Sequence, residues 1–380
     1  MSKQREIRSL TGLRGIAACF IILYHLLAKA HGYQLPMHII MHGYIAVDLF
    51  FVLSGFVMAL TSGGDFLSTF SSVNYFKFLY RRLVRIYPLY IVITIVATLL
   101  SYARLAPTSL PSPSLLTVLS NVALVQAWGI TDSIAGTTWS ISTEFAAYLV
   151  FPIFVAIMLT RRWTWAWLVS VVSIAILIVV ATRSTLELNQ VSNGFPIRSG
   201  PLDAAGPSTI YPLLRCLSEF ALGLLTFRLS RFPIAQRWAT RKFSGDYIFI
   251  LILILLLISD SDIAIVILFV PLIITLATEK SIVARALGCG YLYWLGIISY
   301  SLYLVHFLVN SMLREPLTTI LISMKIPHTY TVGGMLLILP VFILSIASHY
   351  GIEKPCRSFG RKLLEVRPVQ NESSQIRLNP

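Results

Sequence analysis

An arginine and a histidine lie inside the first hydrophobic stretch of the chain, residues 7–30. Placing an ionisable residue such as Arg14 or His25 in a lipid-spanning helix costs free energy, about 2.5–3.5 kcal/mol for an arginine at the centre. Such residues therefore commonly mark functional sites. Their spacing of eleven residues is three helical turns plus about 20°, which places both side chains on one face, about 16 Å apart along the axis. The spacing alone also permits a structural reading, with Arg14 reaching lipid headgroups and His25 satisfied in the core.

A second group of arginines follows in FLYRRLVRIYPLY, which contains Arg81, Arg82 and Arg85. Guanidinium groups match the oxygen geometry of phosphates, so this cluster is suited to a phosphorylated ligand. We therefore expect Arg14, Arg82 and Arg85 to bind such a ligand together. Arg81 is explained more simply as an anchor at the lipid headgroups.

Two carboxylates interrupt other hydrophobic stretches, Asp48 in GYIAVDLFFVLSGF and Glu144 in TTWSISTEFAAY. A carboxylate beside a buried histidine can fix its tautomer and raise its basicity, as a general base requires. We expect His25, Asp48 and Glu144 to form a catalytic group, with a purely structural polar network between helices as the alternative. Arg215 and Glu219 are four residues apart and are expected to pair along one helix.

No metal site is expected. His31, His38 and His42 have spacings of seven and four residues, and only a folded loop would bring their imidazoles together, so we interpret the segment as an ordinary outer loop. The four cysteines are scattered along the chain, show neither metal-ligand spacing nor a paired pattern, and are read as inert thiols.

The composition is that of an integral membrane protein. Of 380 residues, 56% are hydrophobic and only 12% are charged, compared with about 25% charged residues in an average soluble domain. The mean hydropathy is +0.78. The formal net charge of +14 does not require nucleic acid as a partner, because membrane proteins concentrate Lys and Arg in their cytoplasmic loops.

The hydrophobic pattern predicts an all-α polytopic membrane protein with about ten transmembrane helices. The shorter apolar segment 114–128 is expected to lie in the interface or to re-enter the membrane. A turn at Ser259–Asp262 divides the seventh span from the eighth. The expected spans lie near residues 9–30, 44–62, 83–102, 139–159, 163–182, 209–227, 246–260, 262–278, 291–313 and 332–350.

The distribution of basic residues predicts that both termini are cytoplasmic. With that orientation Arg14 faces the cytoplasm, and His25, Asp48 and Glu144 lie in the outer half. We expect a transmembrane domain over residues 1–355 and a cytoplasmic, disordered tail over residues 356–380. Only six of the 30 basic residues then lie in outer segments, namely Lys29, Arg104, Arg183, Arg198, Arg314 and Lys325.

Several blocks of the chain carry a family resemblance. Arg14 and His25 match the R-x10-H signature of the acyltransferase 3 family, and Gly43–Phe56 resembles its G-x-x-x-V-D-x-F-F-x-L-S-G-F block. Arg81–Pro88 resembles the R-R-x-x-R-I-x-P block. TTWSISTEF resembles the W-S/T-L-x-x-E block, with Ile141 where leucine is commoner, and RCLSEFALG, SYSLYLVHF and EKP resemble later segments. The resemblance runs from about Leu10 to Pro355, in register.

The resemblance implies a ten-helix enzyme of the bacterial cytoplasmic (inner) membrane. It implies transfer of an acyl group, usually acetyl, from cytoplasmic acyl-CoA to a hydroxyl of a surface glycan or glycolipid. The expected partners are therefore acyl-CoA as donor substrate, the glycan acceptor and membrane lipid, with no permanently bound cofactor and no nucleic acid. Acceptors such as lipopolysaccharide, exopolysaccharide, a lipo-oligosaccharide or a small glycoside all fit, and outer segments 103–138 and 183–208 are expected to select among them.

The residues suit this chemistry. An arginine layer can hold the phosphates of the donor while its long arm reaches toward His25, which acts as a base or forms a transient acyl-histidine. The developing oxyanion needs a hydrogen-bond donor, for which Ser54, Trp139, Ser140 and Tyr303 are unranked candidates.

The main alternative is a proton-coupled transporter or glycan exporter that uses Asp48, Glu144 and His25 as a proton relay. Carriers often contain internal repeats and interrupted helices at matching positions, and the sequence shows neither. A structural or sensory membrane protein would leave the arginine and histidine layers unexplained.

Overall fold

The computed structural model describes residues 6–27, 39–67, 70–103, 112–188, 191–192, 195–196, 200–203 and 209–365, and almost all of them are helical. The longer helices are α1 (Arg8–Leu27), α3 (Ile45–Ser62), α4 (Ser72–Tyr102), α6 (Trp139–Phe154), α7 (Trp163–Leu188), α8 (Tyr211–Ser230), α10 (Ser244–Leu255), α11 (Asp262–Ala277), α13 (Gly290–Ser323), α14 (Thr329–Ser348) and α15 (Lys354–Glu365). Shorter helices are α5 (Leu115–Val122), α9 (Pro233–Ala239) and α12 (Ile282–Leu287).

Tight turns and one small hairpin complete the described elements. Single 3-10 turns occur at η1 (His42–Tyr44), η2 (Gly63–Phe66) and η3 (Gly136–Thr138), and π-turns at η4 (Val155–Thr160) and η5 (His349–Glu353). The antiparallel strands β1 (Val191–Ser192) and β2 (Phe195–Pro196) pair two residues each.

Seven helical segments in the described part of the chain are long and apolar enough to cross a membrane. Helices α10 and α11 are apolar but shorter, and α8 carries Arg215, Glu219 and Arg228. Each of the ten expected spans coincides with a helix, which confirms the all-helical class. Ten crossings and cytoplasmic termini stay predictions. The seven segments are Arg8–Leu27, Ile39–Phe66, Ser72–Tyr102, Gly136–Thr160, Trp163–Arg183, Gly290–Ser323 and Thr329–Leu364.

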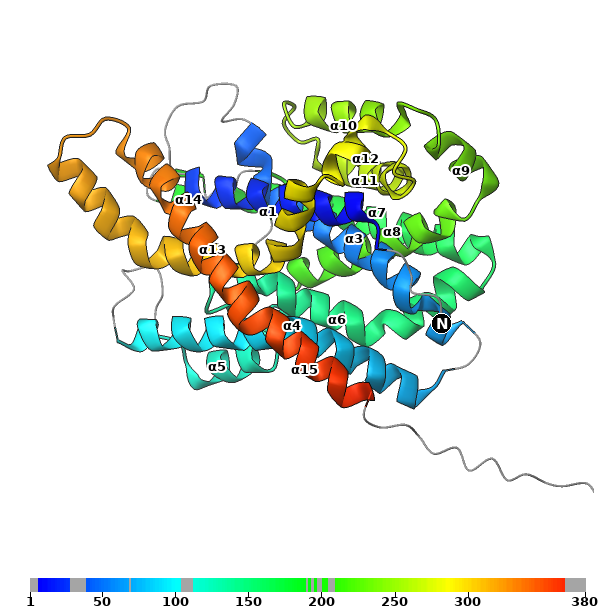
Figure 1. Ribbon diagram of the computed structural model, residues 1–380, viewed down its shortest axis with the longest axis horizontal. Helices are drawn as coiled ribbons and strands as arrows, with labels where there is room; N and C mark the ends of the chain where they lie inside the picture. The colour runs from blue at the N-terminus through cyan, green and yellow to red at the C-terminus, as the bar shows by residue number, and fades with distance from the viewer. Residues whose placement is uncertain are drawn as a thin grey trace, which may run out of the picture.

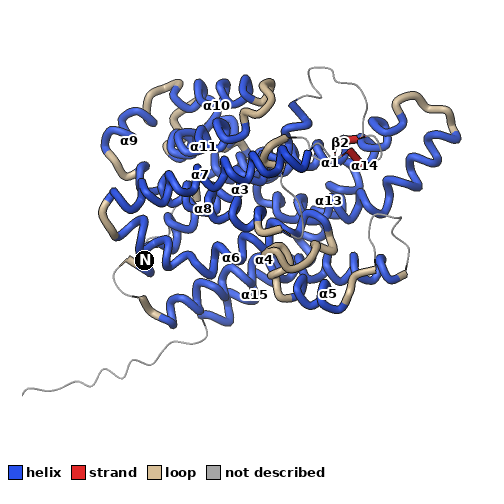
Figure 2. The backbone as a smooth tube through the Cα atoms, turned by 180° about the vertical axis from the view of Figure 1, so that it is seen from behind, coloured by secondary structure: helices blue, strands red, loops and turns tan. Residues whose placement is uncertain are grey.

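The central helices α1, α3, α8 and α13 lie close together (Figures 1 and 2), and two pairs of them cross at glycines. Helix α1 packs along α13, and a Cβ on Gly296 would lie only 1.8 Å from the carbonyl oxygen of Thr11. Helix α3 packs along α8, where a Cβ on Gly55 would lie 2.1 Å from the carbonyl oxygen of Phe220. Small residues allow such close backbone contact between membrane helices. These crossings therefore set the positions of α1 and α3 within the bundle.

The expected boundary at residue 355 falls inside the bundle. Helices α14 and α15 form one helical run, joined by η5, which passes diagonally over α4 (Figure 1). Gly360 of α15 lies against α4, since a Cβ there would be 2.3 Å from Val84 Cγ1. Residues 356–365 are thus helical rather than disordered, because this helix face has a packing partner. Residues 366–380 lie outside the described residues.

The segment predicted to lie in the interface contains α5, followed by turns. Tyr90, which is buried in α4, donates a hydrogen bond of 2.7 Å from its hydroxyl to the carbonyl oxygen of Asn121. The Asn121 amide donates to the carbonyl oxygen of Asp132, 2.9 Å away. Leu115 and Leu119 on α5 are largely exposed. Whether this segment lies in the interface or re-enters the membrane stays a prediction.

Candidate active site

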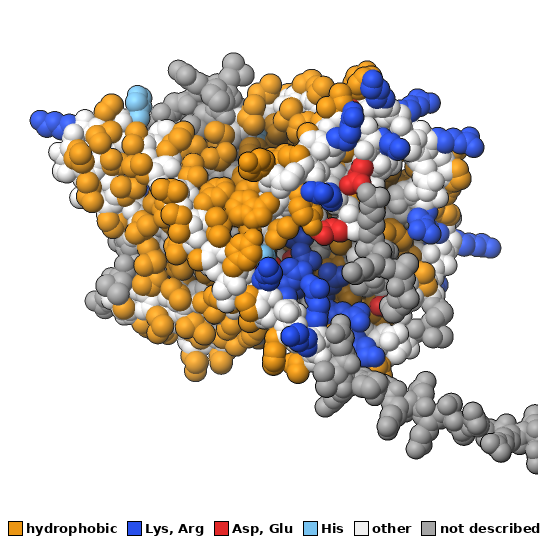
Figure 3. Space-filling view, in the orientation of Figure 1, with side chains coloured by type: hydrophobic (Ala, Val, Ile, Leu, Met, Phe, Trp, Pro, Cys, Tyr) orange, Lys and Arg blue, Asp and Glu red, His pale blue; other side chains and the backbone are white. Residues whose placement is uncertain are grey.

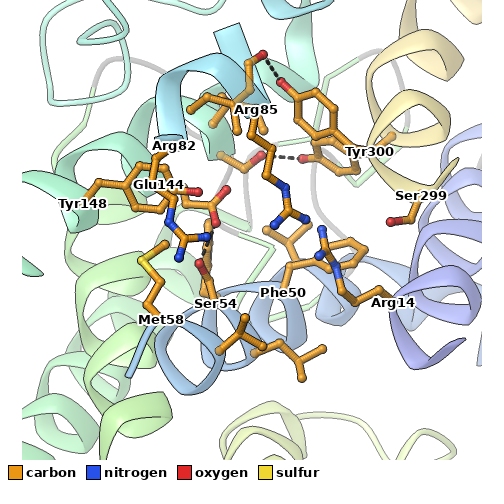
Figure 4. A pocket seen from close by; sticks show the side chains of 18 residues that line it. Arg14, Phe50, Ser54, Met58, Arg82, Arg85, Glu144, Tyr148, Ser299 and Tyr300 are labelled. Atoms are coloured by element: carbon orange, nitrogen blue, oxygen red, sulfur yellow. Dashed lines mark hydrogen bonds between the residues drawn. The ribbon is translucent and has the colours of Figure 1, made fainter. Parts of the chain in front are cut away.

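A cavity lined by α1, α3, α4, α6 and α13 contains the predicted arginines. Its volume is about 780 Å³, counting the space open to solvent at its mouth. Figure 4 shows the guanidinium groups of Arg14 and Arg85 pointing toward one another from α1 and α4, with Arg82 beside Glu144 and Ser54. The other lining residues are Val47, Phe50, Phe51, Leu53, Val57, Met58, Ile86, Ser140, Ile141, Tyr148, Ser299, Tyr300 and Tyr303.

The helical periodicity of α4 directs Arg82 and Arg85 toward the cavity. Its N-terminus is capped by Ser71, whose hydroxyl accepts a hydrogen bond from the backbone of Asn74. Arg82 and Arg85 are three residues apart and share a face of this helix. Arg82 is held by the hydroxyl of Thr61, 3.1 Å from its Nη2. Its guanidinium is therefore fixed at the wall of the cavity.

Arg14 and Arg85 are different, because neither side chain makes a hydrogen bond or ion pair with another described residue. Two like charges that face each other in a cavity of reduced polarity repel each other. A bound anion would relieve this repulsion and accept hydrogen bonds from the N–H groups of both side chains. The sequence-based grouping of Arg14, Arg82 and Arg85 is thus present in the structure, although their role stays a prediction.

Glu144 belongs to the same cavity rather than to a separate outer layer. Its carboxylate accepts a hydrogen bond of 2.6 Å from the hydroxyl of Ser54 on α3. Among the described residues no hydrogen bond or ion pair joins Glu144 to His25. The expected contact between them is wrong, because α6 directs this carboxylate toward the arginines of α4 and Arg14.

Asp48 is also separated from His25. Its Oδ1 accepts a hydrogen bond of 2.8 Å from Arg215 Nε, and its Oδ2 accepts a second from Arg215 Nη2. Both side chains are fully buried. The expected partner Glu219 lies 3.5 Å from the same guanidinium. The planar guanidinium occupies both oxygens of Asp48, so this residue joins α3 to α8 and the expected contact with His25 is wrong.

The partner of His25 is a second histidine, His306 on α13. His306 Nε2 lies 3.1 Å from His25 Nδ1. His306 Nδ1 is 3.2 Å from the carbonyl oxygen of Leu302, and His25 Nδ1 is 3.0 Å from that of Ile21. Carbonyl oxygens only accept, so in the neutral rings both Nδ1 atoms carry hydrogen and His306 Nε2 accepts from His25. This network leaves the lone pair of His25 on Nε2, as a general base requires.

The histidine pair adjoins the cavity through Tyr303, although neither histidine is among the residues that line it. Tyr303 lines the cavity, and its ring centroid is 5.8 Å from that of His306. The hydroxyls of Tyr303 and Ser140 are 2.7 Å apart. His306 is fully buried, whereas His25 is partly exposed. Sequence reasoning did not single out His306, although SYSLYLVHF placed an ionisable residue in an apolar stretch.

Further polar groups lie next to His25 on α1. Its neighbour Tyr24 donates a hydrogen bond of 2.7 Å to Asp203 Oδ2. Tyr44 donates to Asp262 Oδ1, 2.8 Å away, and the backbone N–H of Leu202 donates to the other oxygen of Asp262. Leu202 is thereby bound to α11, and Asp203 is bound to the residue that precedes His25 on α1.

Of the three histidines in the expected outer loop, the structure describes one. His42 is buried in η1, whereas His31 and His38 lie outside the described residues. Across the described part of the chain, no group of three or more His, Cys, Asp or Glu side chains is arranged to hold a metal ion.

Comparison with known proteins identifies the family. A family model described as an acyltransferase domain matches residues 7–349. The chain belongs to the acyltransferase 3 family. The arginine cavity and the histidine pair of this acyltransferase 3 protein both lie within the matched region, and the expected membership is confirmed.

Two curated relatives are similar to this acyltransferase 3 protein over part of their length. Acyltransferase MdmB of Streptomyces mycarofaciens is 31% identical over 236 residues, which are 58% of this chain and 56% of that protein. Protein 2 in picA locus of Rhizobium radiobacter is 40% identical over 82 residues, which are 22% of this chain and 39% of that protein. The chain thus spans little more than half of the first relative and less of the second. No solved structure matches.

Proposed function

We propose that the protein is a membrane O-acyltransferase that moves an acyl group, acetyl in the simplest case, from cytoplasmic acyl-CoA to a hydroxyl of a glycan or glycolipid at the outer face. The observation that carries this proposal is that the guanidinium groups of Arg14 and Arg85 face each other without a partner among the described residues, in a cavity that the His25–His306 pair adjoins through Tyr303. One end of the site suits phosphates and the other suits proton transfer. Acyl-CoA presents phosphates and a reactive thioester at opposite ends of one molecule.

The donor is proposed to enter the cavity with its phosphates at Arg14, Arg82 and Arg85, which can each form paired hydrogen bonds to phosphate oxygens. The apolar wall, including Phe50 and Val57, then accommodates the flexible arm. The thioester is placed toward Tyr303, at the end of the cavity nearest the histidines.

The reaction follows from the tautomer of His25. Its Nε2 removes the proton from the attacking hydroxyl, and the oxygen forms a bond to the thioester carbonyl carbon. The tetrahedral intermediate collapses by breaking the carbon–sulfur bond, and the CoA thiolate takes the proton from the imidazolium. His306 is a positioning residue in this scheme, because it holds the Nδ1 hydrogen of His25.

The hydroxyls of Tyr303 and Ser140 are the best placed of the four proposed oxyanion donors. They lie together where the cavity approaches His306. Ser54 instead donates to Glu144, and the ring of Trp139 packs 5.6 Å from the Arg215 guanidinium. One such donor contributes about 2.7–4 kcal/mol to transition-state stabilisation in a hydrolase that uses the same chemistry.

Glu144 is proposed to balance part of the arginine charge and to hold Ser54, and Asp48 to fasten α3 to α8. The proposed location is the bacterial cytoplasmic (inner) membrane, with the acceptor approaching His25 from outside. A proton-coupled carrier is less well supported, since Asp48 and Glu144 are bonded to other residues and not to His25.

The test is transfer by purified protein supplied with acetyl-CoA labelled in the acetyl group. The wild-type protein should release CoA slowly without acceptor, by hydrolysis, and faster with a hydroxyl acceptor such as a surface glycan extract. A carrier would leave the thioester intact under both conditions. No CoA release with any acceptor would contradict the proposal.

A further inference from the structure

A second hollow, between α4 and α15, continues from the cavity. Its volume is about 1300 Å³, counting space open to solvent. It shares Val57, Arg82 and Arg85 with the cavity described above. We call it the α4–α15 groove. Figure 3 shows Lys and Arg side chains gathered on the face where α15 lies over α4 in Figure 1. The arginines that line the groove are Arg81, Arg82, Arg85, Arg357 and Arg361.

The register of α15 directs two of these arginines into the groove. Arg357, Gly360, Arg361 and Leu364 line it, and a spacing of three and four residues places all of them on one helix face. The missing side chain of Gly360 allows this face to lie against α4. Lys362 is exposed and does not line the groove. The orientation of α15 therefore places Arg357 and Arg361, but not Lys362, along the groove.

Positive charge in the groove is poorly balanced by the protein. Arg357 Nη1 lies 3.4 Å from Glu353 Oε1, a carboxylate that also binds Ser301 and His349. Arg361 makes no hydrogen bond or ion pair with another described residue. No Asp or Glu lines the groove among the described residues. Like charges brought together by two packed helices favour a multiply charged anion between them.

We propose that the α4–α15 groove binds the phosphorylated nucleoside end of the acyl donor, and that α15 is therefore part of the donor site. This inference rests on the proposed function. Because Arg82 and Arg85 line both hollows, the diphosphate of the donor lies at their junction. Its flexible arm extends into the cavity, and its 3′-phosphate contacts Arg361 and Arg357 in the groove.

The phosphates of lipid headgroups are also anions that the arginines of the groove would bind. Exposed Phe359 and Leu363 give α15 an apolar side as well as basic residues, a pattern seen in helices that lie on membranes. The two sources of phosphate differ in a measurable way: a free nucleotide binds in detergent without lipid, whereas a headgroup site responds to the anionic lipid content of vesicles.

The main experiment compares acetyl-CoA with 3′-dephospho-acetyl-CoA as donors for the wild type and Arg361→Ala. The wild type should have a lower KM for acetyl-CoA than for the dephosphorylated donor. Loss of one charged hydrogen-bonding partner should raise the KM of Arg361→Ala for acetyl-CoA about tenfold, with similar kcat, and should leave the KM for the dephosphorylated donor unchanged. Arg361→Lys should retain part of the preference.

Lys362→Ala is the matched control, since it removes one positive charge from the neighbouring position. It should behave as the wild type toward both donors. Direct titration with adenosine 3′,5′-bisphosphate in lipid-free detergent should show weaker binding for Arg361→Ala than for Lys362→Ala. This measurement does not need acyl transfer, so it reports on the groove even if the proposed reaction is wrong.

Equal KM increases for both donors, or equal effects of Arg361→Ala and Lys362→Ala, would overturn the inference while leaving acyl transfer intact. A role in lipid binding would appear as a response of activity to phosphatidylglycerol in vesicles that Arg361→Ala removes, with an unchanged preference between donors, and would also overturn it. Binding of adenosine 3′,5′-bisphosphate without any CoA release would support the groove and refute the proposed function.

Discussion

His25 Nδ1 on α1 and His306 Nε2 on α13 lie 3.1 Å apart. The two residues are far apart in the sequence, and their contact forms where α1 packs along α13. In many enzymes a carboxylate orients the catalytic histidine. Here a neutral histidine, fixed by the carbonyl oxygen of Leu302, can hold the tautomer without adding a negative charge to the apolar interior.

His25→Ala should abolish transfer while the protein remains folded. The substitution removes the proposed base, and general base catalysis contributes about 10²- to 10⁴-fold to rate. Initial rates with labelled acetyl-CoA, together with size-exclusion profiles in detergent, check this prediction. Wild-type rates in the variant would remove His25 from the mechanism.

His306→Ala should lower kcat by about 10- to 100-fold, the range seen when a group that orients a metal-binding histidine is replaced, with little change in the KM for acyl-CoA. His306→Gln should recover part of the loss, because its amide oxygen can accept the Nδ1 hydrogen of His25. A merely structural role would predict equal defects in Ala and Gln variants. Steady-state kinetics of both variants at saturating acceptor distinguish the two cases.

Arg14→Lys should weaken the binding of acetyl-CoA although the positive charge remains. Lysine lacks the planar fork that binds two phosphate oxygens at once. Isothermal titration of the wild type, Arg14→Lys and Arg14→Ala should show successively weaker binding. Arg237→Ala, an exposed arginine of α9, serves as the control and should bind normally. Unchanged affinity in Arg14→Ala would exclude this residue from the donor site.

Asp48→Ala should destabilise the protein, because it removes both oxygens that bind the buried Arg215 guanidinium and leaves Glu219, 3.5 Å away, as its counter-charge. Breaking a buried ion pair typically costs about 3–5 kcal/mol. The triple variant Asp48→Leu/Arg215→Met/Glu219→Leu, which removes the whole buried charge group, should regain much of this stability. Thermal unfolding in detergent measures both variants. Activity in the stable triple variant is expected if Asp48 only fastens α3 to α8, whereas a folded but inactive triple variant would restore a catalytic role.

Donor and acceptor should react from opposite sides of the membrane. In sealed vesicles of known orientation, acetyl-CoA confined to the cytoplasmic face and glycan on the other face should yield acetylated glycan while CoA stays with the donor. Product that forms only when both substrates share one compartment would disprove the through-membrane arrangement.

The sequence by itself determined the helical class, the family and the members of the arginine group. Each depends on local information. Hydrophobic length predicts spans, and Arg82 and Arg85 share a face of α4 through helix periodicity alone. The spacing of Arg14 and His25 likewise required only that residues 8–27 form one helix, as they do in α1.

Only the tertiary structure decided which ionisable groups meet. Asp48, Glu144 and His25 were expected to meet at one depth, yet Asp48 pairs with Arg215, Glu144 faces the arginine cavity and His25 meets His306. The depth of a residue in a span does not specify the rotation of its helix or the neighbour that it faces. Those are set by close crossings such as that of Gly296 with Thr11, where backbone contact between distant segments fixes both helices at once.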